Sequence, residues 1–97
     1  MQPATMYVHL GGEMVVAVTE VVAVLDARLL TASPINQEFV SRAQAAGRVR
    51  GARVAAEWKS MVVTRDLTVF ASGISPATLT RRMTHLRQSA KAWDAET

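Results

Sequence analysis

Apolar and polar residues alternate over positions 6–10, the first patterned stretch of the chain. Val8 and Leu10 face one way, and Tyr7 and His9 face the other. Two glycines follow at positions 11 and 12, and they supply a short turn that tolerates positive φ. The pattern predicts a β-hairpin whose first strand ends at this turn.

The returning strand of this hairpin is expected to cover residues 14–25. Nearly all of its side chains are β-branched or small and apolar, and only Thr19 and Glu20 interrupt them. A strand of this kind needs cover on both faces, which one chain of 97 residues can hardly provide. We therefore expect the protein to complete its core by forming a closed homo-oligomer.

A first helix is predicted to begin at Ser33-Pro34 and to end at Gly47. Serine at the N-cap can accept hydrogen bonds from free backbone N–H groups, and proline at the first helical position gives up none. Glycine after the last helical residue suits a left-handed end. An apolar stripe at helical spacing predicts that the helix faces the core, and its members are Ile35, Phe39, Ala43 and Ala46.

A second helix is predicted from Ser75-Pro76 by the same opening pair. Its apolar stripe either packs on the sheet or forms a subunit contact, and consists of Leu79, Met83, Leu86, Ala90 and Trp93. Polar and basic residues lie opposite or beside the stripe, namely Arg81, Arg82, His85, Arg87, Gln88 and Lys91.

A second hairpin is predicted between the helices, with strands over residues 58–64 and 67–71 and a tight connection at Arg65-Asp66. Trp58, at its beginning, either anchors packing or stacks on a base or a sugar. These elements together predict an α+β fold, a small antiparallel sheet of two hairpins with two α-helices. Residues 6–93 are expected to form one domain, with 1–5 as a disordered lead-in and 94–97 as a tail.

The amino-acid composition excludes several kinds of site and indicates where in the cell the protein is expected. Cysteine is absent, which excludes disulfides, thiolate nucleophiles and Cys-ligated zinc, and this is typical of a reducing cytoplasm. No signal peptide pattern and no apolar run long enough to span a bilayer occurs in the sequence. We therefore expect a cytoplasmic protein with no membrane partner.

The net charge of +3 is unevenly distributed along the chain. Residues 1–47 have two arginines against four carboxylates, a formal charge of −2, and residues 48–97 have nine basic residues against four carboxylates, a formal charge of +5. An asymmetry of this kind is found in proteins that contact nucleic acid or acidic membranes, and also in ordinary solvated faces.

Three arginines surround a glycine within residues 48–53. Arg48 and Arg50 would share one face of an extended segment, and Gly51 would let the backbone approach a phosphate or bend an exposed strand. Arginine donates two parallel hydrogen bonds to phosphate, but bases also keep an edge strand from unwanted pairing. The candidate DNA-binding residues are Arg48, Arg50, Arg53, Lys59, Arg81 and Arg82.

The sequence contains no combination of residues that predicts catalysis. It has no phosphate-binding glycine loop followed by a helix, and its carboxylates are scattered singly. His9 and His85 are the only imidazoles. His9 could be a ligand or a base, but no Asp-rich or nucleophile motif lies near it, so an exposed or interface position is expected for it. We expect no enzyme, no cofactor, no metal and no small-molecule substrate.

Several segments, in order, resemble the RemA/RemB family of bacterial extracellular-matrix regulators, and most closely its RemB branch. The resemblance covers residues 6–83 and is carried by Met6-Tyr-Val-His-Leu-Gly-Gly-Glu-Met-Val-Val16, Val21-Val-Ala-Val-Leu-Asp26, Ser33-Pro-Ile-Asn-Gln-Glu-Phe39, Lys59-Ser-Met-Val-Val-Thr64 and Ile74-Ser-Pro-Ala-Thr-Leu-Thr-Arg-Arg82. It implies a small cytoplasmic α+β protein that forms ring-like oligomers and, in the RemA branch, binds DNA at promoters of matrix (biofilm) genes.

This chain departs from the RemA pattern at two places. The arginine run before the strand that corresponds to Lys59–Thr64 is replaced by Ala55-Ala-Glu-Trp, and a basic residue of the second strand by acidic Glu20. Only Lys59 matches directly, with the arginines of residues 48–53 a little upstream. Two functions follow: an oligomeric regulator that contacts the DNA backbone through a repeated basic surface, or an oligomeric scaffold or partner protein that does not bind DNA.

Overall fold

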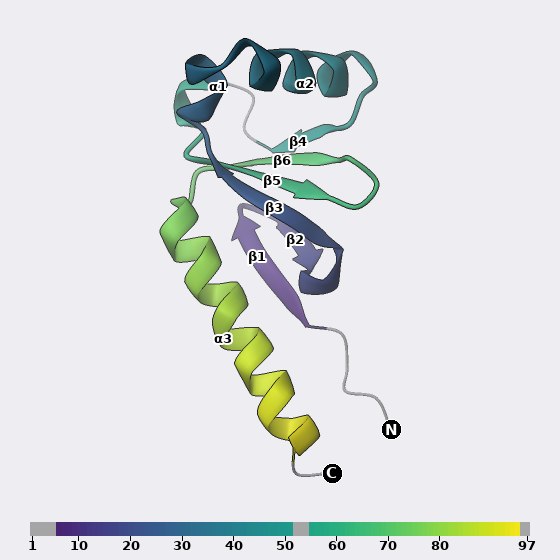
Figure 1. The fold of residues 1–97 in the computed structure, drawn as a ribbon, viewed down its shortest axis with the longest axis vertical. Coiled ribbons are helices and arrows are strands. Elements are labelled where there is room, and N and C mark those ends of the chain that lie inside the picture. Colours follow the sequence, from purple (N-terminus) through teal and green to yellow (C-terminus); the bar gives the residue numbers. More distant parts are fainter. Residues whose placement is uncertain (1–5, 52–54, 96–97) are drawn as a thin grey trace.

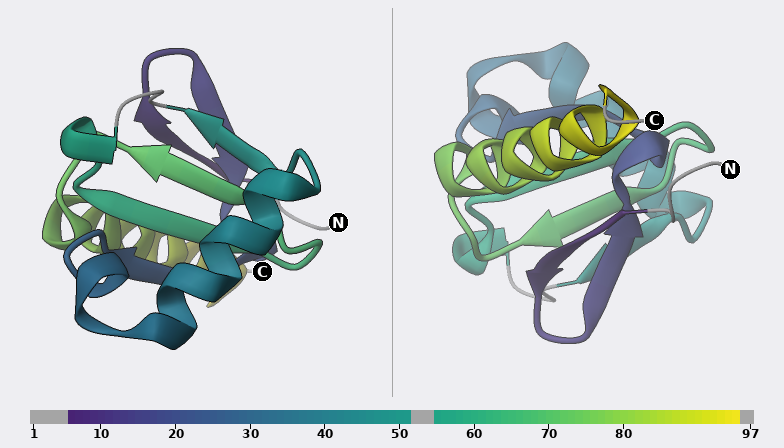
Figure 2. Two further views of the ribbon diagram at one scale, coloured as in Figure 1. Left: turned by 90° about the horizontal axis from the view of Figure 1, so that it is seen from above. Right: turned by 90° about the horizontal axis from the view of Figure 1, so that it is seen from below.

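A four-stranded β-sheet separates two outer layers (Figure 1). The computed structural model of the protein describes residues 6–51 and 55–95, including all of their side chains except those of residues 55 and 89–95. One outer layer consists of the short helix α1 (Leu29–Ala32) and α2 (Pro34–Ala45). The other consists of a β-hairpin and the long helix α3 (Pro76–Ala95), which lie side by side (Figure 2).

The central sheet has the strand order β3-β5-β6-β4. Its strands are β3 (Val21–Asp26), β4 (Val49–Gly51), β5 (Ser60–Thr64) and β6 (Val69–Ser72). β4 pairs with β6 in parallel, whereas the other pairs are antiparallel. The α+β class is confirmed, but the predicted single antiparallel sheet of two hairpins is wrong. The first hairpin forms its own two-stranded sheet, and the described residues form three α-helices where two were expected.

The first hairpin consists of β1 (Tyr7–Gly11) and β2 (Met14–Ala17), and both turn glycines have positive φ as predicted. The continuous strand expected over residues 14–25 is wrong, because the 3-10 turn η1 (Val18–Glu20) divides it. The break falls at the polar pair Thr19 and Glu20, whose side chains are exposed. Backbone hydrogen bonds hold it on both sides: Val18 N–H donates to Met6, and Glu20 accepts from Arg65. β2 and β3 therefore belong to different sheets.

Two apolar clusters stabilise the layers, one on each face of the central sheet. Alternation along β5 sends Val62 into one cluster and its neighbours Met61 and Val63 into the other. The first cluster joins the sheet to the hairpin and α3 through Val8, Leu10, Val16, Val18, Leu79 and Met83. The second lies under α2 and includes Val40, Ala43, Trp58, Val69 and Ala71. Trp58 is thus a packing anchor, as the first of its two interpretations held.

The first predicted helix is confirmed as α2, and Gly47 follows it with a φ of 70°. The predicted Ser33 cap is wrong, because its side chain makes no capping hydrogen bond. Ser33 also closes α1, so its backbone is extended between two helices. The predicted stripe is partly wrong: Ala43 is buried and Phe39 half-buried, but Ile35 is 77% exposed. Val40 takes the core position instead.

The second predicted helix is confirmed as α3, and here the serine cap forms, with Thr78 N–H donating to Ser75 Oγ at 3.3 Å. Leu79 and Met83 are buried and Leu86 is half-buried, so this part of the stripe packs on the sheet. The side chains of Ala90 and Trp93 lie outside the described residues, as do residues 1–5, for which a disordered lead-in was expected. No described helix is long and apolar enough to cross a membrane.

The second predicted hairpin is confirmed as β5 and β6, although β5 begins at Ser60, two residues after Trp58. The connection between them includes Leu67, an exposed residue with a φ of 65°. Positive φ is uncommon for a residue with a branched side chain. Asp66 stabilises this turn by accepting hydrogen bonds from Thr64 Oγ1 at 2.5 Å and from Thr68 N–H at 3.2 Å.

Candidate nucleic-acid interface

Arg48 and Arg50 lie at the β4 edge of the central sheet. Val49 between them packs against the apolar cluster under α2, and alternation would turn the two arginines toward the opposite face. Arg50 is exposed, but its Nη1 donates to the carbonyl oxygens of Gly47 at 2.6 Å and of Val49 at 3.3 Å. Arg48 Nε is buried and has no hydrogen-bond partner among the described residues. The guanidinium groups of this pair are therefore only partly available to a ligand.

Gly51 ends β4 with a φ of 109°. A Cβ atom at this position would overlap the carbonyl oxygen of Ala71 on the neighbouring strand β6, and would lie 3.0 Å from Met14 Sδ. The glycine is thus required for close packing within the protein. This requirement accounts for Gly51 without a phosphate nearby.

Lys59 lies just before β5, at the end of the sheet where β4 ends, with β6 between the two strands. Its backbone N–H donates to Ser72 at 2.8 Å, and its carbonyl accepts from Ala27 at 3.0 Å, while the side chain is exposed. Ala27 precedes Arg28, whose guanidinium forms an ion pair with Asp26 at 2.8 Å. The hydrogen bonds from Arg28 lower the pKa of the Asp26 carboxyl group. Arg28 is thus a second cation near the Lys59 backbone, but its charge is neutralised by Asp26.

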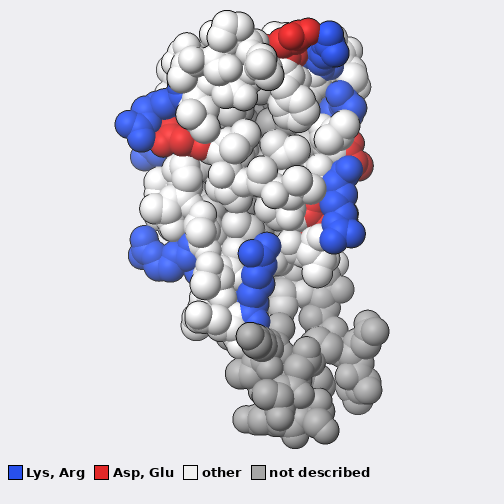
Figure 3. Space-filling model, in the orientation of Figure 1, with Lys and Arg blue, Asp and Glu red and all other residues white. Residues whose placement is uncertain are grey.

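Arg81 and Arg82 are exposed on α3, in the layer opposite α2. Arg82 Nη1 donates to the carbonyl oxygen of His9 on β1 at 3.2 Å. Arg53, the sixth predicted residue, lies outside the described residues. The structure therefore distributes the five described candidates over the β4 edge, the beginning of β5 and α3. Figure 3 shows the basic side chains of one face in separate groups.

Pairing with carboxylates distinguishes the basic residues from one another. Within the described part of the chain, only Arg28 and Arg42 form ion pairs, with Asp26 and Glu38. The five described candidates have no carboxylate within ion-pair distance among these residues, and neither does Arg87, which was not among the predicted site residues. A cation without a carboxylate partner in its own chain can pair with an external anion, because no existing ion pair has to be broken first.

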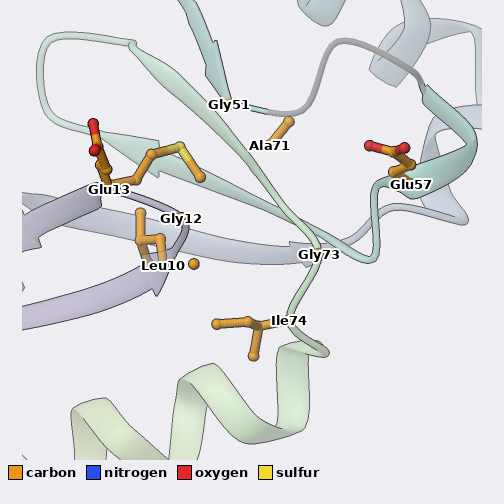
Figure 4. A pocket seen from close by; sticks show the side chains of 10 residues that line it. Leu10, Gly12, Glu13, Gly51, Glu57, Ala71, Gly73 and Ile74 are labelled. Atoms are coloured by element: carbon orange, nitrogen blue, oxygen red, sulfur yellow. The ribbon is translucent and has the colours of Figure 1, made fainter.

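A pocket of about 490 Å³ opens beside the turn of the first hairpin (Figure 4). Its lining comes from that turn, the end of β4 and the segment between β6 and α3, and includes Leu10, Met14, Ala71 and Ile74. Among the described residues, the only charged groups in the lining are the carboxylates of Glu13 and Glu57. Two negative charges repel a phosphate, so the described lining of this pocket does not favour nucleic acid.

The described residues contain no group of three or more His, Asp or Glu side chains that could hold a metal ion. His9 and His85 are both exposed, as expected from the sequence. The two imidazoles come from β1 and α3, the elements that the Arg82 hydrogen bond joins.

The profile of the RemA-like family, described as extracellular matrix regulatory protein A-like, matches residues 7–83. The chain belongs to the RemA-like family. The matched residues include both hairpins, α2 and the beginning of α3, so the RemA-like region contains the whole central sheet. No curated protein sequence matched the chain. The family assignment identifies a protein related to regulators of the extracellular matrix, and the closer relation to the RemB branch stays a prediction.

Proposed function

We propose that this RemA-like protein is an oligomeric DNA-binding regulator of extracellular-matrix (biofilm) genes in the bacterial cytoplasm. The observation that carries the proposal is the set of exposed basic side chains without carboxylate partners among the described residues, on a protein with a net charge of +3. Such cations neutralise the phosphates of a duplex and release its counterions. The exposed members that the structure describes are Arg50, Lys59, Arg65, Arg81, Arg82 and Arg87.

The proposed contact is with the phosphate backbone. Positioning contacts of this kind carry little sequence information, whereas base readout needs side chains that enter a groove. β4 is short and its arginines flank a strand edge, which suits the backbone better than a groove. Affinity should then fall steeply with salt and differ little between unrelated duplexes.

Oligomerisation would multiply this weak contact. β3 is an edge strand of the central sheet, and a register shift between Val21 and Ala23 leaves Val22 64% exposed. Residues 21–25 of this strand include neither a charged residue nor a proline, and an apolar edge of this kind invites pairing with another chain. Subunits joined in a ring would present their basic groups repeatedly, and the assembly would bind more tightly than one copy through effective concentration.

A scaffold or partner protein that does not bind DNA is the second candidate function. The observation in its favour is the state of the β4 arginines, because Arg50 donates to carbonyl groups of its own chain and Arg48 Nε is buried. Acidic Glu20 is exposed at η1, where RemA proteins are expected to have a basic residue. In this case the exposed β3 edge would have the same role, and the basic residues would serve solubility alone.

A mobility-shift titration with two unrelated duplexes separates the two functions. It is run at about 50 and 200 mM salt, between which a protein with six or more phosphate contacts loses ~10³-fold or more of its DNA affinity. We expect the parent to shift both duplexes at low salt with similar affinity. Replacement of Arg48, Arg50 and Arg53 by alanine should weaken binding to both duplexes. It should also reduce the slope of log K against log salt by about 0.9 for each phosphate that is no longer neutralised. Arg42→Ala, which removes an ion-paired cation from α2, is the control and should bind like the parent.

The mass of the free protein is measured by light scattering in the same experiment. An oligomer that shifts neither duplex at low salt would contradict the proposed function and favour the scaffold. A monomer that shifts DNA would contradict the oligomeric part of the proposal.

A further inference from the structure

The outer layer opposite α2 has a face that no helix or strand of the described residues covers. α3 and β1 lie side by side in it, and both pack their inner residues into one cluster, with Val8 and Leu10 from the strand and Leu79 and Met83 from the helix. The outward residues of the two elements therefore form one continuous surface. We call it the α3–β1 surface and define it by Tyr7, His9, Arg81, Arg82 and His85.

We propose that the α3–β1 surface binds the phosphate backbone of duplex DNA and is a contact site separate from the β4 edge. This inference rests on the proposed function, DNA binding, and adds the surface that performs it. It includes three residues, Tyr7, His9 and His85, for which sequence reasoning gave no DNA-binding role.

Charge along α3 favours an anionic ligand. Residues 76–88 of the helix contain three arginines and one histidine, and no Asp or Glu. β1 has no acidic residue either, and the only carboxylate of the hairpin, Glu13, follows the turn glycines. An anion that approaches this surface therefore meets cations without a competing carboxylate from β1 or from residues 76–88 of α3.

The position of Arg82 favours a phosphate in particular. Its Nη1 donates to the His9 carbonyl oxygen, so the guanidinium group is held at the junction of helix and strand. A guanidinium group has five N–H donors, and this hydrogen bond uses one of them. The remaining donors suit a phosphate, which accepts two parallel hydrogen bonds from arginine.

The neighbouring side chains supply further donors at the same surface. Tyr7 is 61% exposed, because alternation along β1 buries Val8 and turns Tyr7 and His9 outward. Tyrosine hydroxyl groups are common donors to DNA phosphates. His85 follows Arg81 by four residues, so the two lie on the same side of α3. The surface thus combines a fixed arginine, a second exposed arginine and a tyrosine hydroxyl.

The β4 edge compares poorly with this arrangement. Arg50 there uses one nitrogen for two carbonyl groups of its own chain, and Arg48 Nε is buried without a partner among the described residues. Arg81 and Arg82 are both exposed, and together they make a single hydrogen bond to the described protein. The α3–β1 surface is therefore the better prepared of the two phosphate sites.

Three charge variants test the assignment: Arg82→Gln and Arg87→Gln, which each remove one positive charge, and the double variant Arg81→Gln with Arg82→Gln. Arg82→Gln removes the cation next to β1, whereas Arg87→Gln removes one about 140° away around the same helix. Both replace arginine with an unbranched, uncharged polar residue of similar helix propensity. In the same mobility-shift titration, we expect Arg81→Gln with Arg82→Gln to weaken binding about tenfold or more. Arg87→Gln should weaken it less than threefold (~0.6 kcal/mol), and Tyr7→Phe should cause a smaller loss than the double variant.

Light scattering and thermal unfolding of each variant accompany the titration. A double variant that keeps the mass, the melting temperature and the DNA affinity of the parent would overturn the α3–β1 assignment and leave DNA binding itself intact. A double variant that loses the parent's mass would show that the surface joins subunits, which also overturns the assignment. A parent that shifts no duplex would contradict the proposed function instead.

Discussion

Ser72 Oγ donates a hydrogen bond to the carbonyl oxygen of Leu10 at 2.6 Å, and both residues are fully buried. The bond joins β6 of the central sheet to the end of β1, and its two residues are 62 positions apart in the sequence. The same hydroxyl accepts from Ile74 N–H at 3.0 Å, just before α3 begins. One side chain thus links the sheet, the hairpin and the entry to α3.

Ser72→Ala should lower the free energy of unfolding by about 1–3 kcal/mol, because it leaves a buried carbonyl and a partly buried N–H without their partner. Urea unfolding monitored by circular dichroism measures the change. Ser41→Ala, at an exposed position of α2, is the matched control and should change stability by no more than about 0.5 kcal/mol. Equal effects of the two changes would contradict a bridging role for Ser72.

Gly51→Ala should destabilise the protein more than Gly12→Ala. Both glycines have positive φ, so alanine at either position costs about 1–2 kcal/mol of backbone strain. At Gly12 the new methyl group meets nothing within 4 Å, whereas at Gly51 it overlaps the Ala71 carbonyl. Overpacking adds roughly 1–3 kcal/mol at Gly51. Melting temperatures of the two variants test the difference, and a larger loss at Gly12 would be the contrary result.

Removal of Asp66 should make stability less dependent on pH in the acid range. Hydrogen bonds from Thr64 and Thr68 lower the pKa of this carboxyl group below its ordinary value of 3.8. A lowered pKa in the folded state stabilises the protein above pH 3.8, and this contribution is lost as the pH falls through the folded-state pKa. Asp66→Ala should therefore be less stable than the parent at pH 7, and the gap should narrow below pH 3.8. Urea midpoints at pH 7 and at lower pH give the comparison.

Val22→Lys should abolish self-association if the β3 edge joins the subunits. A lysine on an edge strand opposes pairing with another strand because its charge would be desolvated. Light scattering should then give a monomer mass. Ile35→Lys is the control, since Ile35 is equally apolar and 77% exposed, but lies on α2 away from this edge. A variant at Val22 that assembles like the parent would move the subunit contact elsewhere.

Local signals in the sequence were enough to predict most elements of the fold. The glycine turn at residues 11–12, the two Ser-Pro helix starts and Gly47 each act within a few residues, and the structure has an element boundary at all of them. The break at η1 was missed because Thr19 and Glu20 are only a brief interruption of an apolar run. Backbone hydrogen bonds from Val18 to Met6 and from Arg65 to Glu20 determine it, and periodicity does not register such bonds.

The sequence identified the basic residues of the candidate site, but it did not predict which of them lie on the same surface of the folded protein. A shared face for Arg48 and Arg50 could be predicted because alternation along a strand is local. That Arg82 would reach His9, 73 positions away, depends on the packing of α3 beside β1. No spacing rule connects a helix near the end of the chain to a strand near its beginning. The parallel pairing of β4 with β6 was missed for the same reason.

The absence of carboxylates from residues 76–88 also affects the stability of the folded protein. The helix brings Arg81, Arg82 and Arg87 within two turns of one another, and like charges at this range repel. Salt screens this repulsion, so added salt should raise the melting temperature of the free protein. The same salt should weaken its hold on DNA. Conformational stability and DNA affinity would then change in opposite directions with ionic strength. A bound polyanion such as DNA would reduce the repulsion between the arginines of α3, as salt does in the free protein.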